Sequence, residues 1–266
     1  MMASSPTLPP VGPGLTRAKA SSSLARSKES PAPDQVRGDD SFGRRRDDLE
    51  RYFDSTAQKA WIDLTSDAPV SGVRATVRAG RKAMRDTLLG WLPEDLRRTR
   101  ILDAGCGTGA LSVAAACRGA EVVGVDVAGG LIEVARQREP FTGHGRIHWR
   151  AGDMLDPQLG EFAHVVAMDS LIHYREADLI AALAALGERT SQSILFTFVP
   201  RTPLLFAMYQ TGKLFPRKDR SPRLVPLAEA DLRRSLARLD GWQVARSHRV
   251  SRGFYTSHAI ELVRRG

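Results

Sequence analysis

A glycine-rich segment carries the residues with the clearest chemistry. It contains, in order, Asp103, Gly105, Cys106, Gly107 and Gly109. The segment follows the apolar pair Ile101-Leu102, which predicts a short strand. Glycines after a strand allow a tight turn and close approach of the backbone to a ligand, and the N–H groups at the start of the next helix face that ligand. The segment therefore predicts a cofactor-binding loop, in which Cys106 is a small residue that a tight turn tolerates.

The glycines alone do not decide which cofactor this loop binds. Gly105, Gly107 and Ala110 also fit the dinucleotide-binding pattern GxGxxG/A. Asp103, however, precedes the first glycine by two residues, where a carboxylate favours a cationic amino-acid group and gains little beside a pyrophosphate. The third glycine, Gly109, completes the pattern D-x-G-x-G-x-G, which resembles the motif of S-adenosylmethionine (SAM) methyltransferases.

Acidic residues after the next two predicted strands favour the same cofactor. Asp126 ends the second strand, where a carboxylate can accept hydrogen bonds from both ribose hydroxyls. Asp153 and Met154 follow the third strand and place an acid and an apolar side chain beside the expected adenine. The remaining predicted cofactor contacts are Val127 and Asp169. Taken in this order, these segments resemble a class-I SAM-dependent methyltransferase.

The pattern of apolar residues predicts the elements that position these loops. Helices are predicted over 47–66, 70–92, 111–117, 131–137, 178–186 and 229–239. Strands are predicted over 101–102, 121–127, 147–150, 162–168, 193–199, 242–250 and 254–263. Short apolar runs that alternate with helices are typical of a parallel sheet covered on both faces, and the last two strands permit an antiparallel hairpin. The expected fold is α/β and Rossmann-like, with a mostly parallel seven-stranded sheet.

Composition divides the chain into a tail and a globular part. The chain has 266 residues, of which 42% are hydrophobic, and a net charge of +9. Residues 1–46 are rich in Ser, Pro and Arg, so we expect a disordered tail. We expect an N-terminal helical lid over 47–98 and a methyltransferase domain over 99–266, with a helical insertion at 201–227. Two cysteines exclude a disulfide-stapled fold, and no apolar run approaches the roughly 18–20 residues that span a bilayer.

Two basic regions point to anionic partners. The helix predicted over 70–92 has a basic face formed by Arg74, Arg78, Arg81, Lys82 and Arg85. This face is either an ordinary solvated surface or a wall that attracts an anionic substrate or membrane. In the insertion, an apolar stretch over 203–215 precedes a basic run, a pattern that fits a membrane interface, a cap over the substrate site or a plain structural helix.

Segments outside the glycine loop identify a narrower family. They are Arg51–Asp54 with Trp61, Asp169–Tyr174, Phe196–Leu205 and Leu214–Pro222. Over roughly residues 49–264 the chain resembles the magnesium-protoporphyrin O-methyltransferases of (bacterio)chlorophyll biosynthesis, in their bacterial form. The resemblance implies methyl transfer from SAM to the C13 propionate of Mg-protoporphyrin IX, which gives the 13-monomethyl ester and S-adenosylhomocysteine. It also implies that magnesium belongs to the substrate, and we expect no protein-bound metal because the histidines lack metal-ligand spacing.

His173 and Tyr52 are the predicted catalytic residues. By resemblance, His173 matches a histidine implicated near the family's active site. Members commonly have a tyrosine four residues after the tryptophan, whereas here Trp61 is followed by Thr65. If that tyrosine helps to cover the site, either Tyr52 or Tyr174 substitutes for it or the handling of the substrate differs. A propionate is already ionised at neutral pH and needs alignment more than a base. We therefore expect His173 to orient the substrate.

The resemblance also sets expectations for partners and location. We expect Mg-protoporphyrin IX as substrate, the large subunit of magnesium chelatase as a candidate partner, and a cytoplasmic protein with peripheral contact to the photosynthetic membrane. We expect no nucleic-acid partner, because the chain lacks an aromatic-basic RNA-binding module. Three alternatives stay open: a methyltransferase for RNA, one for another small molecule, and a SAM-binding scaffold that delivers porphyrin.

Overall fold

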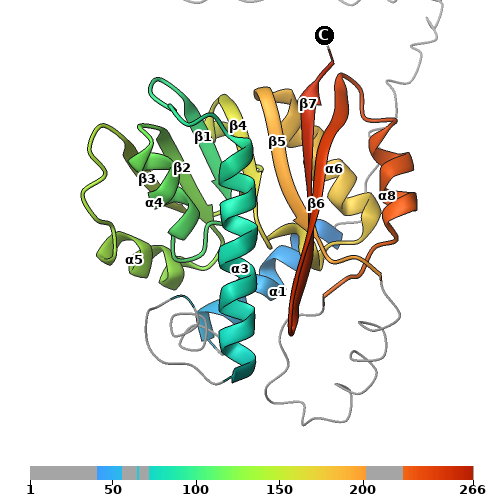
Figure 1. The fold of residues 1–266 in the computed structure, drawn as a ribbon, viewed down its shortest axis with the longest axis horizontal. Helices are drawn as coiled ribbons and strands as arrows, with labels where there is room; N and C mark the ends of the chain where they lie inside the picture. Colours follow the sequence, from blue (N-terminus) through green and yellow to red (C-terminus); the bar gives the residue numbers. More distant parts are fainter. Residues whose placement is uncertain (1–40, 56–64, 66–71, 202–223, 266) are drawn as a thin grey trace, which may run out of the picture. The chain divides into compact units, whose positions relative to one another are not determined.

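A seven-stranded sheet forms the centre of the structure, a computed structural model that describes residues 41–55, 65, 72–201 and 224–265 (Figure 1). Its strands are β1 (Arg100–Ala104), β2 (Glu121–Asp126), β3 (Arg146–Ala151), β4 (Phe162–Ala167), β5 (Thr190–Phe198), β6 (Trp242–Arg252) and β7 (Tyr255–Arg264). Their spatial order is β3-β2-β1-β4-β5-β7-β6. Strands β1 to β5 pair in parallel, and β7 pairs antiparallel with both β5 and β6. This confirms the expected mostly parallel sheet and its closing hairpin.

Helices cover both faces of this sheet. They are α1 (Ser41–Ser55), α3 (Gly72–Trp91), α4 (Ala110–Cys117), α5 (Gly129–Gln137), α6 (Glu176–Glu188) and α8 (Glu229–Leu236), with short 3₁₀ helices η1 (Pro157–Leu159) and η2 (Leu171–His173). Successive strand residues point to opposite faces. Ile101 accordingly packs with α3 and α4, whereas Leu102 packs with α6 and α8. The continuous apolar runs in the sequence reflect this burial on two sides.

The N-terminal boundary differs from the prediction. Helix α1 begins at Ser41, so the predicted boundary after residue 46 falls inside a helix. Phe42 stacks on the buried Tyr174, with ring centroids 4.4 Å apart. Composition did not reveal this contact, because residues 41–46 include three arginines and only one apolar anchor. The second half of the predicted 47–66 helix lies mostly outside the described residues.

Helix α3 is held firmly against the sheet. Its residues Met84 and Leu88 are fully buried and pack with α4 and with the β5–β7 region. At Gly80 the helix approaches Tyr255 so closely that an added Cβ would lie 2.4 Å from the tyrosine ring. The apolar side of α3 is therefore part of the core, and its cationic side must face elsewhere.

Most of the predicted insertion at 201–227 lies outside the described residues. Its end is anchored, since Leu227 N–H donates to the Val199 carbonyl and Arg201 N–H donates to the Leu227 carbonyl. Among the helices that the structure describes, none is long and apolar enough to cross a membrane.

Candidate functional site

A cavity of about 750 Å³ lies where the parallel strands end. Loops after β1, β2, β3 and β4 line it, together with α1, α3 and the start of β7. The predicted site residues in its wall are Tyr52, Asp103, Gly105, Cys106, Gly107, Asp126, Val127, Met154, Asp169 and His173. Gly109 and Asp153 are absent from the wall. Residues more than 120 positions apart in the chain thus meet at one edge of the sheet, where α/β folds bind ligands.

The glycine loop is built around the end of β2. The backbone N–H groups of Gly105 and Cys106 both donate to the Val125 carbonyl, at 2.8 and 3.0 Å. Gly105 has a φ of 81°, in the left-handed region that favours glycine. An added Cβ there would lie 2.2 Å from Cβ of Ser170, so only glycine lets the two loops meet.

Asp126 is held in a fixed orientation at the end of β2. One carboxylate oxygen accepts a hydrogen bond from Gly107 N–H at 2.8 Å, and the other accepts one from Ala128 N–H at 3.0 Å. These bonds tie Asp126 to the glycine loop and to the start of α5. The half-buried carboxylate lines the cavity, as a ribose acceptor must.

Asp103 lies at the bottom of the cavity and is almost completely buried. Ser112 Oγ donates a hydrogen bond to its carboxylate at 2.6 Å. Burial raises the pKa of Asp103 to about 7; the bonds from Ser112 oppose the rise, and the charge of Asp126 adds to it. A cationic group bound beside Asp103 would stabilise the ionised form.

We expect the affinity for SAM to fall below pH 7. Because Asp103 in the free protein takes up a proton as the pH falls through about 7, binding of a cationic amino group must release that proton. The dissociation constant should rise about tenfold for each pH unit between pH 7 and pH 5. Calorimetric titration at several pH values measures this slope.

Asp103→Asn is the control for this prediction. The amide keeps the shape and cannot ionise, so the variant should bind SAM more weakly and with no slope over the same range. A wild-type affinity that is constant from pH 5 to pH 7 contradicts the assignment of Asp103 to the cationic end of the cofactor.

Gly109 packs closely against a neighbouring aromatic ring, and its predicted contact with the cofactor stays a prediction. It precedes α4 with a φ of 81°. A Cβ there would lie 2.2 Å from the ring of Trp149, which fills the space beside β2. The close contact with Trp149 is by itself a sufficient reason for glycine at this position.

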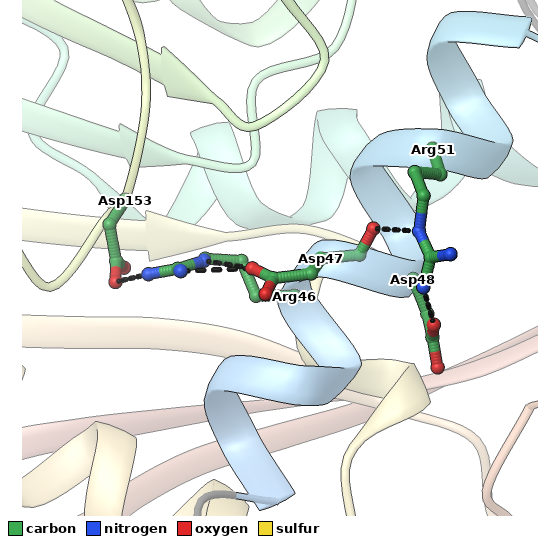
Figure 2. A network of polar contacts seen from close by, with 5 residues as sticks. All are labelled: Arg46, Asp47, Asp48, Arg51 and Asp153. Carbon is green, nitrogen blue, oxygen red and sulfur yellow. Dashed lines mark hydrogen bonds and ion pairs between the residues drawn. The ribbon is translucent and has the colours of Figure 1, made fainter.

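Asp153 connects α1 to the loop after β3 (Figure 2). Its carboxylate accepts from Arg46 Nη1 at 2.9 Å and from Leu155 N–H at 2.8 Å. Arg46 also pairs with Asp47, and Arg51 on the next turn pairs with Asp48. The neighbouring Met154 and Gly152 line the cavity, whereas Asp153 itself does not. Its predicted contact with adenine stays a prediction.

Asp169 is the centre of a buried polar network. Its carboxylate accepts hydrogen bonds from Arg81 at 2.6 Å, Tyr255 OH at 3.1 Å, Thr197 Oγ1 at 3.2 Å and Ser257 Oγ at 3.3 Å. Its φ of 55° is unusual for a residue other than glycine, and these contacts hold it there. The network ties α3 to β5 and β7. Asp169 also lines the cavity, and its predicted contact with the cofactor stays a prediction.

Ser170 lines the cavity, although the sequence analysis gave it no role of its own within the segment Asp169–Tyr174. Its Oγ is buried, lines the same cavity as Gly105 and makes no hydrogen bond to any residue in the described ranges. A buried hydroxyl without a partner is costly unless a ligand supplies one. The signals in the sequence were its place three residues after β4 and its membership of the segment Asp169–Tyr174.

His173 and Tyr52 line the same cavity from opposite parts of the chain. His173 is buried, with 6% of its surface exposed, at the end of η2. Tyr52 is half-buried on α1, and Thr65 is also part of the wall. Tyr174 lines the cavity as well, but its ring stacks on Phe42 and burial raises the pKa of its hydroxyl. Tyr52 is therefore the better placed of the two tyrosines to act on a ligand.

Two further features of the site are the thiol of Cys106 and the arrangement of potential metal ligands. Burial raises the pKa of the Cys106 thiol well above its usual value, and the nearby carboxylates of Asp103 and Asp126 add to the rise. Cys106 therefore stays protonated and fills space in the turn. In the part of the chain that the structure describes, no group of three or more His, Cys, Asp or Glu side chains could hold a metal ion.

Comparisons with known families agree with this arrangement. A family model described as "Magnesium-protoporphyrin IX methyltransferase C-terminus" matches residues 167–264, and one described as "Methyltransferase domain" matches residues 101–191. The chain is 48% identical over 217 residues to the magnesium-protoporphyrin O-methyltransferase of Rhodobacter capsulatus, covering 81% of this chain and 95% of that protein. It is 31% identical over 216 residues to the magnesium-protoporphyrin O-methyltransferase of Synechocystis, covering 80% of this chain and 94% of that protein.

A solved structure shares the fold at similar coverage. The crystal structure of magnesium protoporphyrin IX methyltransferase (ChlM) from Synechocystis PCC 6803 with bound SAH superposes with a TM-score of 0.74 and 29% sequence identity. The match covers 82% of this chain and 99% of that one.

Proposed function

The chain belongs to the magnesium-protoporphyrin O-methyltransferase family, and on this premise we propose that it methylates the C13 propionate carboxylate of Mg-protoporphyrin IX. It is a SAM-dependent methyltransferase with a Rossmann-like fold. The observation that carries the proposal is the single cavity that contains the glycine loop, Asp126 and His173 together.

The residues at the strand ends fit SAM. Asp103 and the unpartnered hydroxyl of Ser170 offer polar contacts for the amino-acid end. Asp126 offers a carboxylate for the ribose, and Met154 an apolar surface for the adenine. Gly105 leaves the space that a side chain would occupy. When bound, SAM supplies an electrophilic methyl group on a sulfonium centre.

The acceptor needs no strong base. A propionate carboxylate is ionised above about pH 5. One of its oxygens forms the new bond to the methyl carbon as the carbon–sulfur bond breaks, which gives a methyl ester and a neutral thioether. The chain's task is to align the carboxylate and to remove its water, and such positioning can lower a barrier by about 7–11 kcal/mol.

His173 and Tyr52 are placed to perform that alignment. Both line the cavity that holds the glycine loop, and His173 is nearly enclosed. A hydrogen-bond donor on either residue can hold the carboxylate oxygen that does not react. We assign both as positioning residues on this ground.

The test is methyl transfer from labelled SAM to three acceptors. Mg-protoporphyrin IX, metal-free protoporphyrin IX and a pool of RNA are compared under the same conditions. We expect label in a porphyrin methyl ester, with the magnesium form preferred. Label in RNA would overturn the proposal, and SAM binding without transfer to any acceptor would favour a porphyrin-delivering scaffold.

Two partners extend this proposal. We propose peripheral contact with the photosynthetic membrane and an encounter with the large subunit of magnesium chelatase, through the basic and apolar surface of the chain. The basic balance of 39 Lys and Arg against 30 Asp and Glu supports attraction to an anionic surface. Sedimentation with anionic vesicles and co-purification with the chelatase subunit test the two contacts separately.

A further inference from the structure

The walls of the cavity carry opposite charges. Its carboxylates are Asp103, Asp126 and Asp169, which stand at the ends of the strands. Its Arg and Lys side chains, among the residues that the structure describes, all come from α3. They are Arg74, Arg78, Arg81, Lys82 and Arg85, the cationic face of α3. A cavity divided in this way suits a cationic ligand on one side and an anionic ligand on the other.

The fold holds the cationic face in this position. Arg74, Arg78, Arg81 and Arg85 are spaced by four, three and four residues, so they lie on one side of the helix. Met84 and Leu88, on the neighbouring side of the helix, are buried in the core and fix its rotation. At 1.5 Å per residue the face extends for about 16 Å. Figure 1 shows the first half of α3 passing beyond the ends of the parallel strands, on the side where α1 lies.

Arg81 and Lys82 of this face are paired with acids. Arg81 bonds the buried Asp169 at 2.6 Å, and Lys82 bonds Asp86 on the next turn at 2.6 Å. Arg74 and Arg85 form no ion pair with any residue in the described part of the chain, although Arg85 is half-buried. Like charges crowded along a partly enclosed wall repel one another. A bound anion removes that repulsion, and a guanidinium matches a carboxylate with two parallel hydrogen bonds.

We infer that the cationic face of α3 binds the propionate carboxylate that is not methylated, and so selects which of the two propionates reaches the methyl donor. This inference rests on the proposed function, because it assigns the second carboxylate of that substrate. The reacting carboxylate must lie beside the cofactor, at the acidic end of the cavity. Within the described ranges, the Arg and Lys side chains that line the cavity and could bind the second carboxylate come from α3.

Double substitution of Arg78 and Arg85 by glutamine tests this assignment. Glutamine keeps a long polar side chain with good helix propensity and removes the charge. Arg81 is left intact because it holds Asp169. The control is the double substitution of Arg234 and Arg238 by glutamine, which removes the same charge from exposed positions on and just after α8, outside the cavity. A lysine pair at 78 and 85 restores the charge without the paired hydrogen bonds.

Two ligands are compared by porphyrin fluorescence titration in the absence of SAM. One is Mg-protoporphyrin IX, and the other is the same porphyrin with its C17 propionate converted to a neutral amide. We expect the glutamine pair to bind the dicarboxylate at least tenfold more weakly than the wild type and to bind the amide within twofold of it. The wild type itself should bind the amide at least tenfold more weakly than the dicarboxylate. The lysine pair should bind the dicarboxylate with an affinity between that of the wild type and that of the glutamine pair.

The products give a second readout. With SAM added, the glutamine pair should form ester at both propionates, whereas the wild type should form a single monoester. Equal binding of both ligands by the wild type, or an equal loss for both in the glutamine pair, would overturn the inference. So would unchanged porphyrin binding combined with lost binding to anionic vesicles, which would assign the face to a membrane. A wild type that methylates no porphyrin would instead overturn the proposed function, before any variant is compared.

Discussion

Replacing Asp126 by alanine should weaken SAM binding by about 100-fold while leaving the binding of Mg-protoporphyrin IX within threefold of the wild type. The carboxylate is fixed by Gly107 N–H and Ala128 N–H, so its remaining lone pairs can accept from the ribose without reorganisation. Hydrogen bonds to a charged acceptor are worth about 1.5–3 kcal/mol each. The loss of one or two such hydrogen bonds accounts for the expected loss of about 100-fold in SAM affinity. Calorimetry measures the first affinity and porphyrin fluorescence the second.

Asp156 provides the matched control for this experiment. Its carboxylate also accepts from the backbone N–H two residues ahead, that of Gln158 at 2.9 Å, yet Asp156 does not line the cavity. Asp156→Ala should therefore lower the free energy of unfolding and change the affinity for SAM by no more than twofold. If Asp126→Ala loses both ligands equally, or loses neither, Asp126 is not the ribose acceptor.

Replacing His173 by alanine should lower turnover by about 100-fold and leave SAM affinity within twofold. His173 is enclosed in the cavity wall. Misplacement of the acceptor carboxylate by about 1 Å can lower the rate about 100-fold. Because the propionate is ionised without help, the loss should be the same from pH 6 to pH 8. Steady-state kinetics with both substrates, together with a SAM titration, separate the effect on kcat from the effect on binding.

A conservative variant separates orientation from general base catalysis. His173→Gln retains a hydrogen-bond donor and should recover part of the lost turnover, whereas a residue needed as a base would not be replaced by an amide. His148→Ala, on the exposed edge strand β3 and outside the cavity, should behave as the wild type. Wild-type turnover in His173→Ala would assign His173 to packing alone.

The sequence alone was sufficient for the sheet and the cofactor loop. Parallel strands buried on both faces appear as short apolar runs, and β1, β2 and β4 lie within two residues of their predicted bounds. The glycine loop is contiguous, and its conformation follows from a turn that only glycines can make at Gly105. Asp126 could be placed in the cavity wall because its position at the end of a strand fixes where its carboxylate lies, and its contact with the ribose stays a prediction. These features are local, so a local pattern reveals them.

Only the tertiary structure decided the contacts between distant segments. Arg46 and Asp153 are 107 positions apart, and Arg81 and Asp169 are 88 positions apart. Nothing near either arginine in the sequence indicates its partner. The contact between Gly109 and Trp149 is of the same kind, since it depends on the pairing of β2 with β3.

The basic face of α3 shows most clearly which properties follow from the sequence and which from the tertiary structure. Its spacing predicted a cationic stripe on a helix, and the sequence left open whether water or a ligand faces it. In the structure this stripe lines the cavity, because Met84 and Leu88 bury a neighbouring side of the helix in the core and so fix its rotation. Periodicity specifies which residues share a face of a helix, whereas the packing of that helix against the rest of the chain determines what the face meets.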